Sequence, residues 1–297
     1  ARRQADIAKE RIYQYKLKQE DSTEYVDFYR TETNQVTWKY SKLKPIVKFP
    51  VNTDDFKEAP VCIVEHPDYD VLRGTYVIGV DCINKNESID RINSLATIYV
   101  MKRMTDPLGA CQHSIVAWYA GRPSDISVFY NIALNLSEYY NAIILPELNE
   151  RFSDFFVNKK KGSIIQNAIA LARDINPTSF AKGSEKGLSP TTRNQKYGME
   201  LAVAYTIEEL VDNNGGISLG VTRIPDPMLL EEMLAYRGKT SASKGVHDGN
   251  YDRIIAYGLC LTLARHYDIE YKTIDWKPEK RKYEEPKQID RIPSFFG

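Results

Sequence analysis

The chain has 297 residues, of which 42% are hydrophobic and 27% are charged. This composition is typical of a globular protein, and the length predicts one large domain or one domain with an extension. The 40 Lys and Arg residues balance 40 Asp and Glu residues, so the chain has no overall positive charge. Any binding of nucleic acid must then come from local basic patches. No apolar run reaches the roughly 18 residues of a membrane span, so we expect no membrane partner.

Residues 1–75 differ in character from the rest of the chain. Their charge is high, alternation is weak between Tyr25 and Tyr40, and the segment KPIVKFP is extended and bounded by prolines. We expect an N-terminal extension or linker that packs on the main domain. The chain begins at Ala1 rather than Met, which suggests a piece of a longer polypeptide.

From Tyr76 onward the pattern is that of strands alternating with helices. The apolar, β-branched runs at 76–81 (YVIGVD) and 94–101 (SLATIYVM) predict a buried strand and its antiparallel return, with a third strand at 113–119. A helix capped by Ser124 or Asp125 then leads to a buried strand at 142–145. Such alternation predicts an α/β sheet with its site at the carboxyl ends of the strands.

The second half continues with fewer strands. We predict a helix over 195–212, a strand or hairpin arm over 217–224, a helix from Pro225 to Tyr236, and a last helix entered at 246–252. The main domain is therefore expected to span 76–270. The remainder, 271–297, is expected to be a charged and loosely ordered tail.

Carboxylates occur at three boundaries between the predicted elements, which we call stations. Asp81 ends one strand and Glu147 follows another, while Asp248 and Asp252 stand four apart at the entrance of the last helix. Clustered carboxylates repel one another unless a divalent cation neutralises them, and Mg²⁺ or Mn²⁺ prefers such oxygen ligands. Two such ions activate water and stabilise the leaving oxygen of a phosphodiester. The order of the stations is the layout of ribonuclease H-like nucleases.

Each acid has an alternative interpretation. A single carboxylate after a strand is often a turn or helix-cap residue, and Asp248 suits a helix N-cap. His247 is a ligand, a phosphate contact or a polar residue before a helix. The basic residues near the acidic end either follow a phosphate backbone or are solvated surface charges; they are Lys159, Lys160, Lys161, Lys182, Lys186, Arg193, Lys196, Arg237, Lys239 and Lys244.

Four stretches in this order resemble the C-terminal nuclease domain of tailed-bacteriophage terminase large subunits. They are YVIGVD with Asp90 downstream, IILPELN, TTRNQKYGMELAVAYTIEEL, and the run from GGISLGVTRIPDP through GVHDGNYDRIIAYGLCLTLA. The resemblance covers residues 76–266. It implies an α/β ribonuclease H-like fold, a mixed central sheet flanked by helices, and metal-dependent cutting of concatemeric double-stranded phage DNA.

The resemblance also assigns the metal ligands. Asp81 matches the first ligand and Glu147 the second, with two Mg²⁺ or Mn²⁺ ions as cofactors. At the third station the family often carries His-Asp-Asp, whereas this chain reads His247-Asp248-Gly249. Either Asp248 or Asp252 is then the main ligand, and our hypothesis is Asp252. Accessory positions are Asp90, Asn149 and His247.

The implied partners are double-stranded DNA, the ATPase domain of the same polypeptide, the portal and the small terminase subunit, at the procapsid in the host cytoplasm. That ATPase is missing here, since Gly238-Lys239-Thr240 imitates a P-loop end only partly, with Met233 at the first-glycine position, and no G-x-G-x-x-G occurs. The alternatives are a resolvase- or transposase-type nuclease of the same fold, and a non-catalytic DNA-gripping or portal-docking module. The four cysteines form no C-x-x-C pair, and with no signal peptide they predict free thiols in a soluble intracellular protein.

Overall fold

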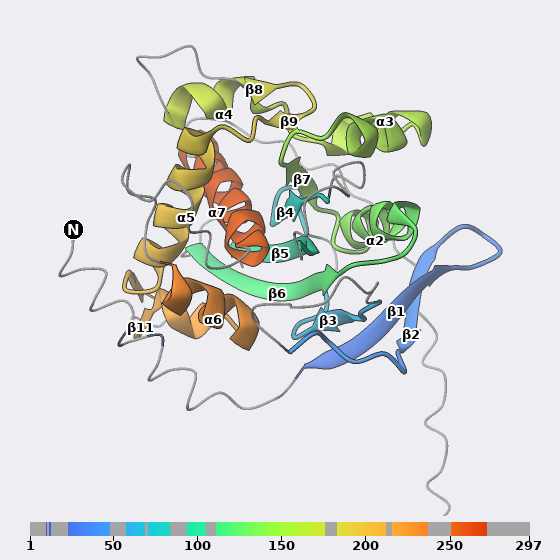
Figure 1. Cartoon of the computed structure of the whole chain (residues 1–297), viewed down its shortest axis with the longest axis horizontal. Coiled ribbons are helices and arrows are strands. Elements are labelled where there is room, and N and C mark those ends of the chain that lie inside the picture. The colour runs from blue at the N-terminus through green and yellow to red at the C-terminus, as the bar shows by residue number, and fades with distance from the viewer. Residues whose placement is uncertain are drawn as a thin grey trace, which may run out of the picture.

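The computed structural model describes residues 10, 12, 23–47, 58–68, 71–83, 94–104, 111–175, 183–211, 216–236 and 251–271. They form a seven-stranded sheet with helices on both faces, and two further sheets of two strands each (Figure 1). The strands are β1 Glu24–Arg30, β2 Val36–Tyr40, β3 Val61–Ile63, β4 Tyr76–Asp81, β5 Ala96–Met104, β6 Cys111–Gly121, β7 Ile143–Pro146, β8 Gly183–Ser184, β9 Gly187–Leu188, β10 Glu209–Val211 and β11 Ile217–Leu219. The helices are α2 Ile126–Tyr139, α3 Glu150–Asn158, α4 Ala168–Ile175, α5 Thr192–Tyr205, α6 Pro227–Ala235 and α7 Asp252–Tyr271, with 3-10 turns at Gly162–Ile164 and Gly220–Arg223.

The large sheet has the strand order β2-β1-β3-β6-β5-β4-β7. All neighbouring strands are antiparallel except β4 and β7, which are parallel and are reached through β5, β6 and α2. Three antiparallel strands followed by a helix and a parallel strand make a mixed sheet. The predicted fold class, an α/β protein with a mixed central sheet flanked by helices, is confirmed.

The N-terminal region contributes strands to the same sheet. β3 pairs with β6 at Cys62 and Trp118, and β1 and β2 continue the sheet beyond β3. The long strand β6 would otherwise present unpaired amides and carbonyls at an edge, and the added strands satisfy them. The described part of residues 1–75 therefore extends the sheet.

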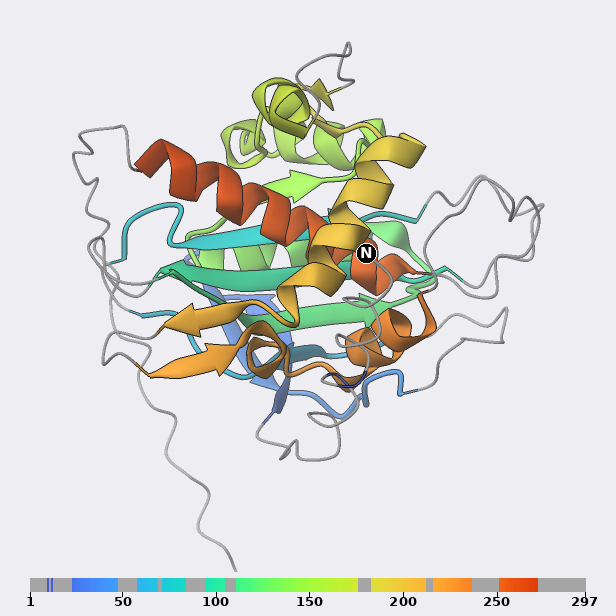
Figure 2. The same ribbon diagram turned by 90° about the vertical axis from the view of Figure 1, so that its left-hand side faces the viewer.

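Two apolar layers cover the two faces of the sheet. Val77 of β4 belongs to the layer beneath α5, α6 and α7, whereas its neighbours Tyr76 and Ile78 belong to the layer beneath α2 and α3. All six residues of β4 are buried, as expected of a strand covered on both faces. Figure 2 shows α7 lying over one face of the sheet at a slant to the strands, with α5 crossing it.

The helix α7 lies unusually close to β4. A Cβ on Gly79 would stand 2.0 Å from the carbonyl oxygen of Ala256 and 2.6 Å from the amide nitrogen of Cys260. The amide of Gly79 donates to the Cys260 thiol over 2.9 Å. Glycine at this position therefore permits the contact between strand and helix, and the N-terminal end of α7 is brought to the carboxyl end of β4.

Several predicted elements differ in extent. The predicted strands at 76–81, 94–101, 113–119 and 142–145 are confirmed as β4, β5, β6 and β7, and Asp125 is the cap of α2. The helix predicted over 195–212 ends at Tyr205 instead, because the chain turns into β10, which pairs with β11. β11 ends at Leu219 and continues as a 3-10 turn, so the strand predicted over 217–224 is shorter. Helices α3 and α4 are additional.

Three cysteines are described as free thiols, namely Cys62, Cys82 and Cys260, which agrees with the prediction for them. Within the described ranges, no helix combines the length and apolar character needed to cross a membrane. Most of the predicted tail, 272–297, lies outside the described residues.

Candidate active site

Two of the predicted acids end adjacent parallel strands. Val80 of β4 is in register with Pro146 of β7, so Asp81 and Glu147 occupy the next position on each strand. The Glu147 amide donates to the carbonyl of Val80 over 2.8 Å, which continues the ladder to this point. A parallel pair thus delivers two carboxylates to one sheet edge, as the sequence pattern predicted.

Glu147 is held from a second side by α5. The amide of Gln195 donates to a carboxylate oxygen of Glu147 over 2.8 Å. The backbone of Glu147 also forms a parallel bridge with Leu188, and the amide of Leu148 donates to the Leu188 carbonyl over 2.8 Å. These contacts leave little freedom to the position of the Glu147 carboxylate.

Asp252 is the first residue of α7 and comes to the same end of the sheet. Its side chain is only 9% exposed and accepts a 2.7 Å hydrogen bond from the amide of Leu95, at the entrance to β5. Thr97, which pairs with Asp81 across β4 and β5, donates its hydroxyl to the carbonyl of Asp252 over 2.9 Å. Asp252 is therefore tied to the residue that faces Asp81 in the sheet.

The three carboxylates influence one another electrostatically. Burial raises the pKa of Asp81 well above its usual range, and Glu147, Asp252 and Glu232 raise it further. Burial also raises the pKa of Asp252 to about 7, although the Leu95 amide and Arg253 act in the opposite direction, and Glu147 adds to the rise. The thiol pKa of Cys82 is raised by burial and by Asp81 and Glu147. Burial and mutual repulsion therefore make it costly for these carboxyls to be ionised together.

The ligand atoms that these side chains offer are of the type that a hard divalent cation prefers. Asp81, Glu147 and Asp252 offer carboxylate oxygens, the ligands that Mg²⁺ and Mn²⁺ prefer. All the main influences on the Asp81 pKa raise it, so an ionised Asp81 requires a compensating positive charge. Over the described ranges, however, no three His, Cys, Asp or Glu side chains lie close enough together to hold one ion. The types of side chain therefore suit a metal ion, but the described side chains do not lie close enough together for three of them to hold one ion.

The remaining predicted site residues have varied positions. Asn149 caps α3, its side-chain oxygen accepting from the amide of Phe152 over 3.1 Å, so that oxygen serves the helix. Asp90, His247 and Asp248 lie outside the described residues, and so do Lys182, Arg237, Lys239 and Lys244. Whether Asp248 joins the site remains a prediction.

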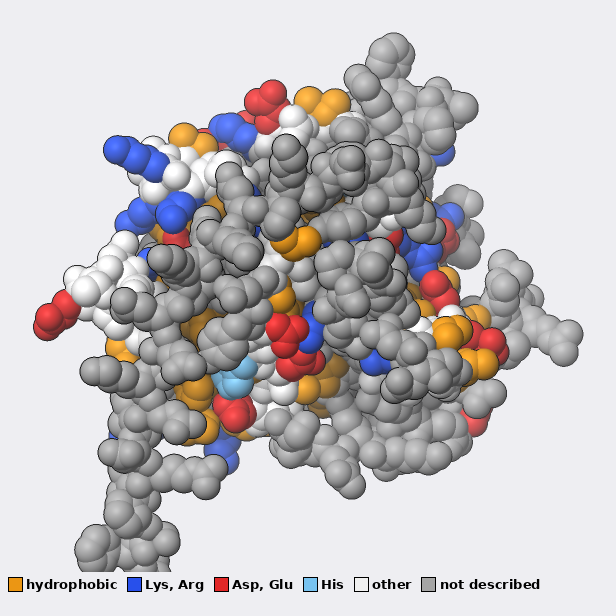
Figure 3. Space-filling view, turned by 180° about the vertical axis from the view of Figure 1, so that it is seen from behind, with side chains coloured by type: hydrophobic (Ala, Val, Ile, Leu, Met, Phe, Trp, Pro, Cys, Tyr) orange, Lys and Arg blue, Asp and Glu red, His pale blue; other side chains and the backbone are white. Residues whose placement is uncertain are grey.

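Three of the predicted DNA-binding lysines are paired with carboxylates. Lys161 contacts Glu138 at 2.9 Å, Lys186 contacts Asp154 at 2.7 Å, and Lys196 contacts Glu200 at 3.7 Å. Lys159 lies over the Phe155 ring, and Lys160 and Arg193 are exposed. Seen from behind, Lys and Arg side chains gather at the corner formed by α3 (Figure 3).

Sequence reasoning missed four polar neighbours of the acids. Gln195 contacts Glu147, while Glu232 raises the pKa of Asp81 and Arg253 and Arg122 lower that of Asp252. Arg253 directly follows Asp252, which is a weak signal. Gln195 is 48 residues from its partner, and no spacing rule connects two such positions.

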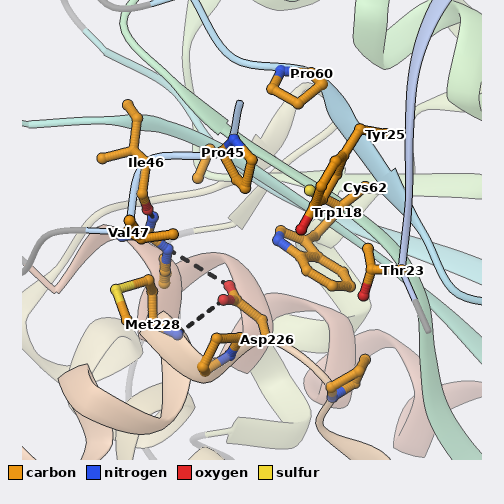
Figure 4. A pocket seen from close by; sticks show the side chains of 14 residues that line it. Thr23, Tyr25, Pro45, Ile46, Val47, Pro60, Cys62, Trp118, Asp226 and Met228 are labelled. Atoms are coloured by element: carbon orange, nitrogen blue, oxygen red, sulfur yellow. Dashed lines mark hydrogen bonds and ion pairs between the residues drawn. The ribbon is translucent and has the colours of Figure 1, made fainter. Parts of the chain in front are cut away.

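A cavity of about 290 Å³ lies on the other side of the start of α7. Figure 4 shows its lining, in which Tyr25, Cys62 and Trp118 face Ile46, Asp226 and Met228. Neither Asp81 nor Glu147 lines it. A much smaller space of about 10 Å³ lies beside Glu147 and Gln195, which is close to the smallest space that can hold one water molecule.

Comparisons with known proteins give little further information. No family model matches the chain, and no curated protein matches its sequence. Among solved structures, the large terminase nuclease from thermophilic phage G20c is similar with a TM-score of 0.36 and 14% sequence identity, over 68% of this chain and 87% of that chain. Agreement at this level is too low to transfer function or site residues.

Proposed function

We propose that this chain is a metal-dependent endonuclease domain that hydrolyses phosphodiester bonds in double-stranded DNA, as in the large terminase subunit of a tailed phage. The observation that carries the proposal is that Asp81, Glu147 and Asp252 lie at the same end of a mixed sheet, where burial and the charges of Glu147 and Asp252 raise the pKa of Asp81. Buried acids of this kind are frequent in active sites and costly elsewhere.

Asp81, Glu147 and Asp252 are the residues that would hold two Mg²⁺ or Mn²⁺ ions, with Asp81 serving both and Asp248 assisting Asp252. When bound, such ions supply an activated water and stabilise the leaving oxygen. The chain itself fixes the carboxylates through Val80, Gln195 and Leu95. The burial of Asp81 and Asp252 limits competing water and strengthens the attraction for a cation.

The DNA would lie along basic residues of α5, which holds Glu147 through Gln195, and would extend to those that follow α3, on the side where Lys161 meets Glu138 at the end of α2. Lys159, Lys160 and Arg193 are the described candidates that form no ion pair with another described residue, and each is therefore suited to a phosphate contact. The proposal includes the ATPase domain of the same polypeptide, the portal and the small terminase subunit as partners, at the procapsid in the host cytoplasm. Those partners rest on the sequence resemblance alone.

The test is plasmid cleavage by the purified chain with Mn²⁺, Mg²⁺, Ca²⁺ or EDTA, beside the Asp81→Asn and Asp154→Asn variants. Asp154 is 56% exposed and paired with Lys186, so its variant controls for the chemical change. We expect cutting with Mn²⁺ or Mg²⁺ that is lost in Asp81→Asn, while DNA binding is retained. Asp154→Asn should cut as the wild type does.

Other outcomes decide between the alternatives. A wild-type chain that neither cuts DNA nor gains thermal stability with Mn²⁺ would be a DNA-gripping or portal-docking module, and the proposal would be wrong. Preferential cutting of four-way junctions, or joining of DNA ends, would instead indicate a resolvase- or transposase-type enzyme. Full activity in Asp81→Asn would exclude this site.

A further inference from the structure

The start of α7 is capped by a side chain from another helix. Glu232 of α6 is 2% exposed, and one of its carboxylate oxygens accepts hydrogen bonds from the amides of Arg253 at 3.0 Å and Ile254 at 3.2 Å. These amides belong to the first turn of α7, where no helical carbonyl is available to them. A carboxylate at this end of a helix is also favoured by the helix dipole.

Arg253 completes the link between the two helices. Its guanidinium donates to the other Glu232 oxygen over 3.2 Å, lies 3.5 Å from Asp226, and donates to the carbonyl of Ile46 over 3.2 Å. Arg253 is 2% exposed, so these charges are compensated inside the protein. Figure 4 shows Asp226 bonded to the backbone of Met228 at the start of α6, beside Ile46 and Val47.

The same cluster is anchored to the sheet. Tyr99 of β5 donates its hydroxyl to Asp226, and Tyr99 stands two residues from Thr97 on that strand. Thr97 binds the carbonyl of Asp252, and Leu95 binds its carboxylate. Asp252 is consequently held between β5 on one side and the Glu232 and Arg253 pair on the other.

We propose that Glu232, acting with Arg253, is a positioning residue that sets the place and direction of the Asp252 carboxylate for cation binding. This inference rests on the proposed function. The carboxylate of Glu232 bonds Arg253 and Ile254, and it thereby fixes the helical turn from which Asp252 projects. Residues that support a metal ligand typically change metal affinity by about 10- to 100-fold, and Glu232 would act in this way through Arg253 and Ile254, the two residues that follow Asp252.

The experiment measures Mn²⁺ binding to the full 297-residue chain by titration calorimetry, and cleavage rate against Mn²⁺ concentration. Glu232→Gln keeps the size and one acceptor oxygen but removes the charge that Arg253 faces. We expect Mn²⁺ affinity to fall by about 10-fold or more, with the cleavage rate restored at saturating Mn²⁺. A role only in folding would lower activity without this rescue.

Glu208→Gln is the matched control. Glu208 also pairs with an arginine of α7, Arg265, but this pair is far from Asp252 along the helix and its glutamate side chain is 44% exposed. This variant should bind Mn²⁺ as the wild type does. If Glu232→Gln does not fold, Arg253→Lys is measured instead, since it keeps the charge and loses the forked contact; the same fall in affinity is expected.

The possible results distinguish a failure of this inference from a failure of the proposed function. A wild-type chain without Mn²⁺ binding or cleavage removes the proposed function and this inference with it. A wild-type chain that binds and cuts, beside a folded Glu232→Gln with unchanged affinity, overturns the inference alone. Failure of both variants to fold also overturns it, because the cluster would then serve the whole fold.

Discussion

The backbone amide of Glu147 donates a 2.8 Å hydrogen bond to the carbonyl of Val80, which fixes the end of β7 beside the end of β4. Asp81 follows Val80 directly, so the two carboxylates are neighbours through the parallel ladder. Because the backbone holds them, their mutual repulsion cannot be relieved by moving the strands apart. The protein instead needs protons or cations at this edge.

Gln195→Ala should weaken cation binding without unfolding the protein. The Gln195 amide orients the Glu147 carboxylate over 2.8 Å, and its removal takes away this orienting hydrogen bond. We expect the cleavage rate at limiting Mn²⁺ to fall about 10-fold, as for other residues that orient a metal ligand, and to recover at high Mn²⁺. Rates across a Mn²⁺ series test this. Thr192→Ala, an exposed change in the first turn of α5, is the control, and equal rates for both variants would refute the role of Gln195.

Lys160→Ala should reduce the salt dependence of DNA binding more than Lys186→Ala does. Lys160 is exposed at the α3 corner, whereas Lys186 is already paired with Asp154 at 2.7 Å. A lysine that contacts a phosphate contributes about 0.9 to the slope of log affinity against log salt concentration. Binding of a linear duplex measured between low and moderate salt gives these slopes. An unchanged slope for Lys160→Ala would place the DNA elsewhere.

The position of the acids could be read from the sequence because each follows an element boundary. The strand YVIGVD ends on Asp81, and Glu147 follows the short apolar strand at 142–145, which makes both candidates visible without a structure. Burial of Asp252 also agrees with the hypothesis that it points inward. Its assignment as a metal ligand remains a prediction.

The supporting contacts could not be read in the same way. Glu232 is 21 residues from Arg253, and Leu95 is 157 residues from Asp252. These pairs depend on how α6, α7 and β5 pack, and packing is decided by side-chain shape across the whole core. The early end of α5 is a similar case, because pairing of β10 with β11 overrides the helical pattern after Tyr205.

Asp268→Asn should destabilise the far end of α7, especially at neutral pH. Asp268 contacts Arg103 at 2.6 Å and His113 at 2.7 Å, and Arg103 is 1% exposed, so the variant removes the negative charge that faces a buried cation. We expect a loss of about 3 kcal/mol in the free energy of unfolding, measured by urea denaturation. A loss below about 0.5 kcal/mol, typical of surface changes, would contradict this account.

The contacts of Asp268 with Arg103 and His113 also predict how the free energy of unfolding depends on pH. Burial alone would raise the pKa of Asp268, but the hydrogen bonds and charges of His113 and Arg103 outweigh it, and the pKa lies below its ordinary value. The unfolded chain therefore binds this proton first as the pH falls below about 4. Stability from Asp268 is present above that pH and is lost as the pH falls through the folded pKa. In Asp268→Asn, the loss of stability that comes from protonation of Asp268 at low pH should be absent.

Gly79→Ala should both destabilise the protein and weaken its cation site. The added methyl group would stand 2.0 Å from the Ala256 carbonyl oxygen, a backbone atom that cannot rotate away. α7 must then move from β4, at a cost of about 3 kcal/mol in the free energy of unfolding, near the upper end for overpacking. The same movement separates Asp252 from Asp81, so Mn²⁺ affinity should fall beyond what the lost stability explains.

Gly162→Ala is the control, since its nearest neighbour is a Val157 methyl group at 3.2 Å, and it should leave Mn²⁺ binding unchanged. Normal Mn²⁺ affinity in a folded Gly79→Ala protein would mean that the close packing of α7 on β4 does not set the spacing of the two acids.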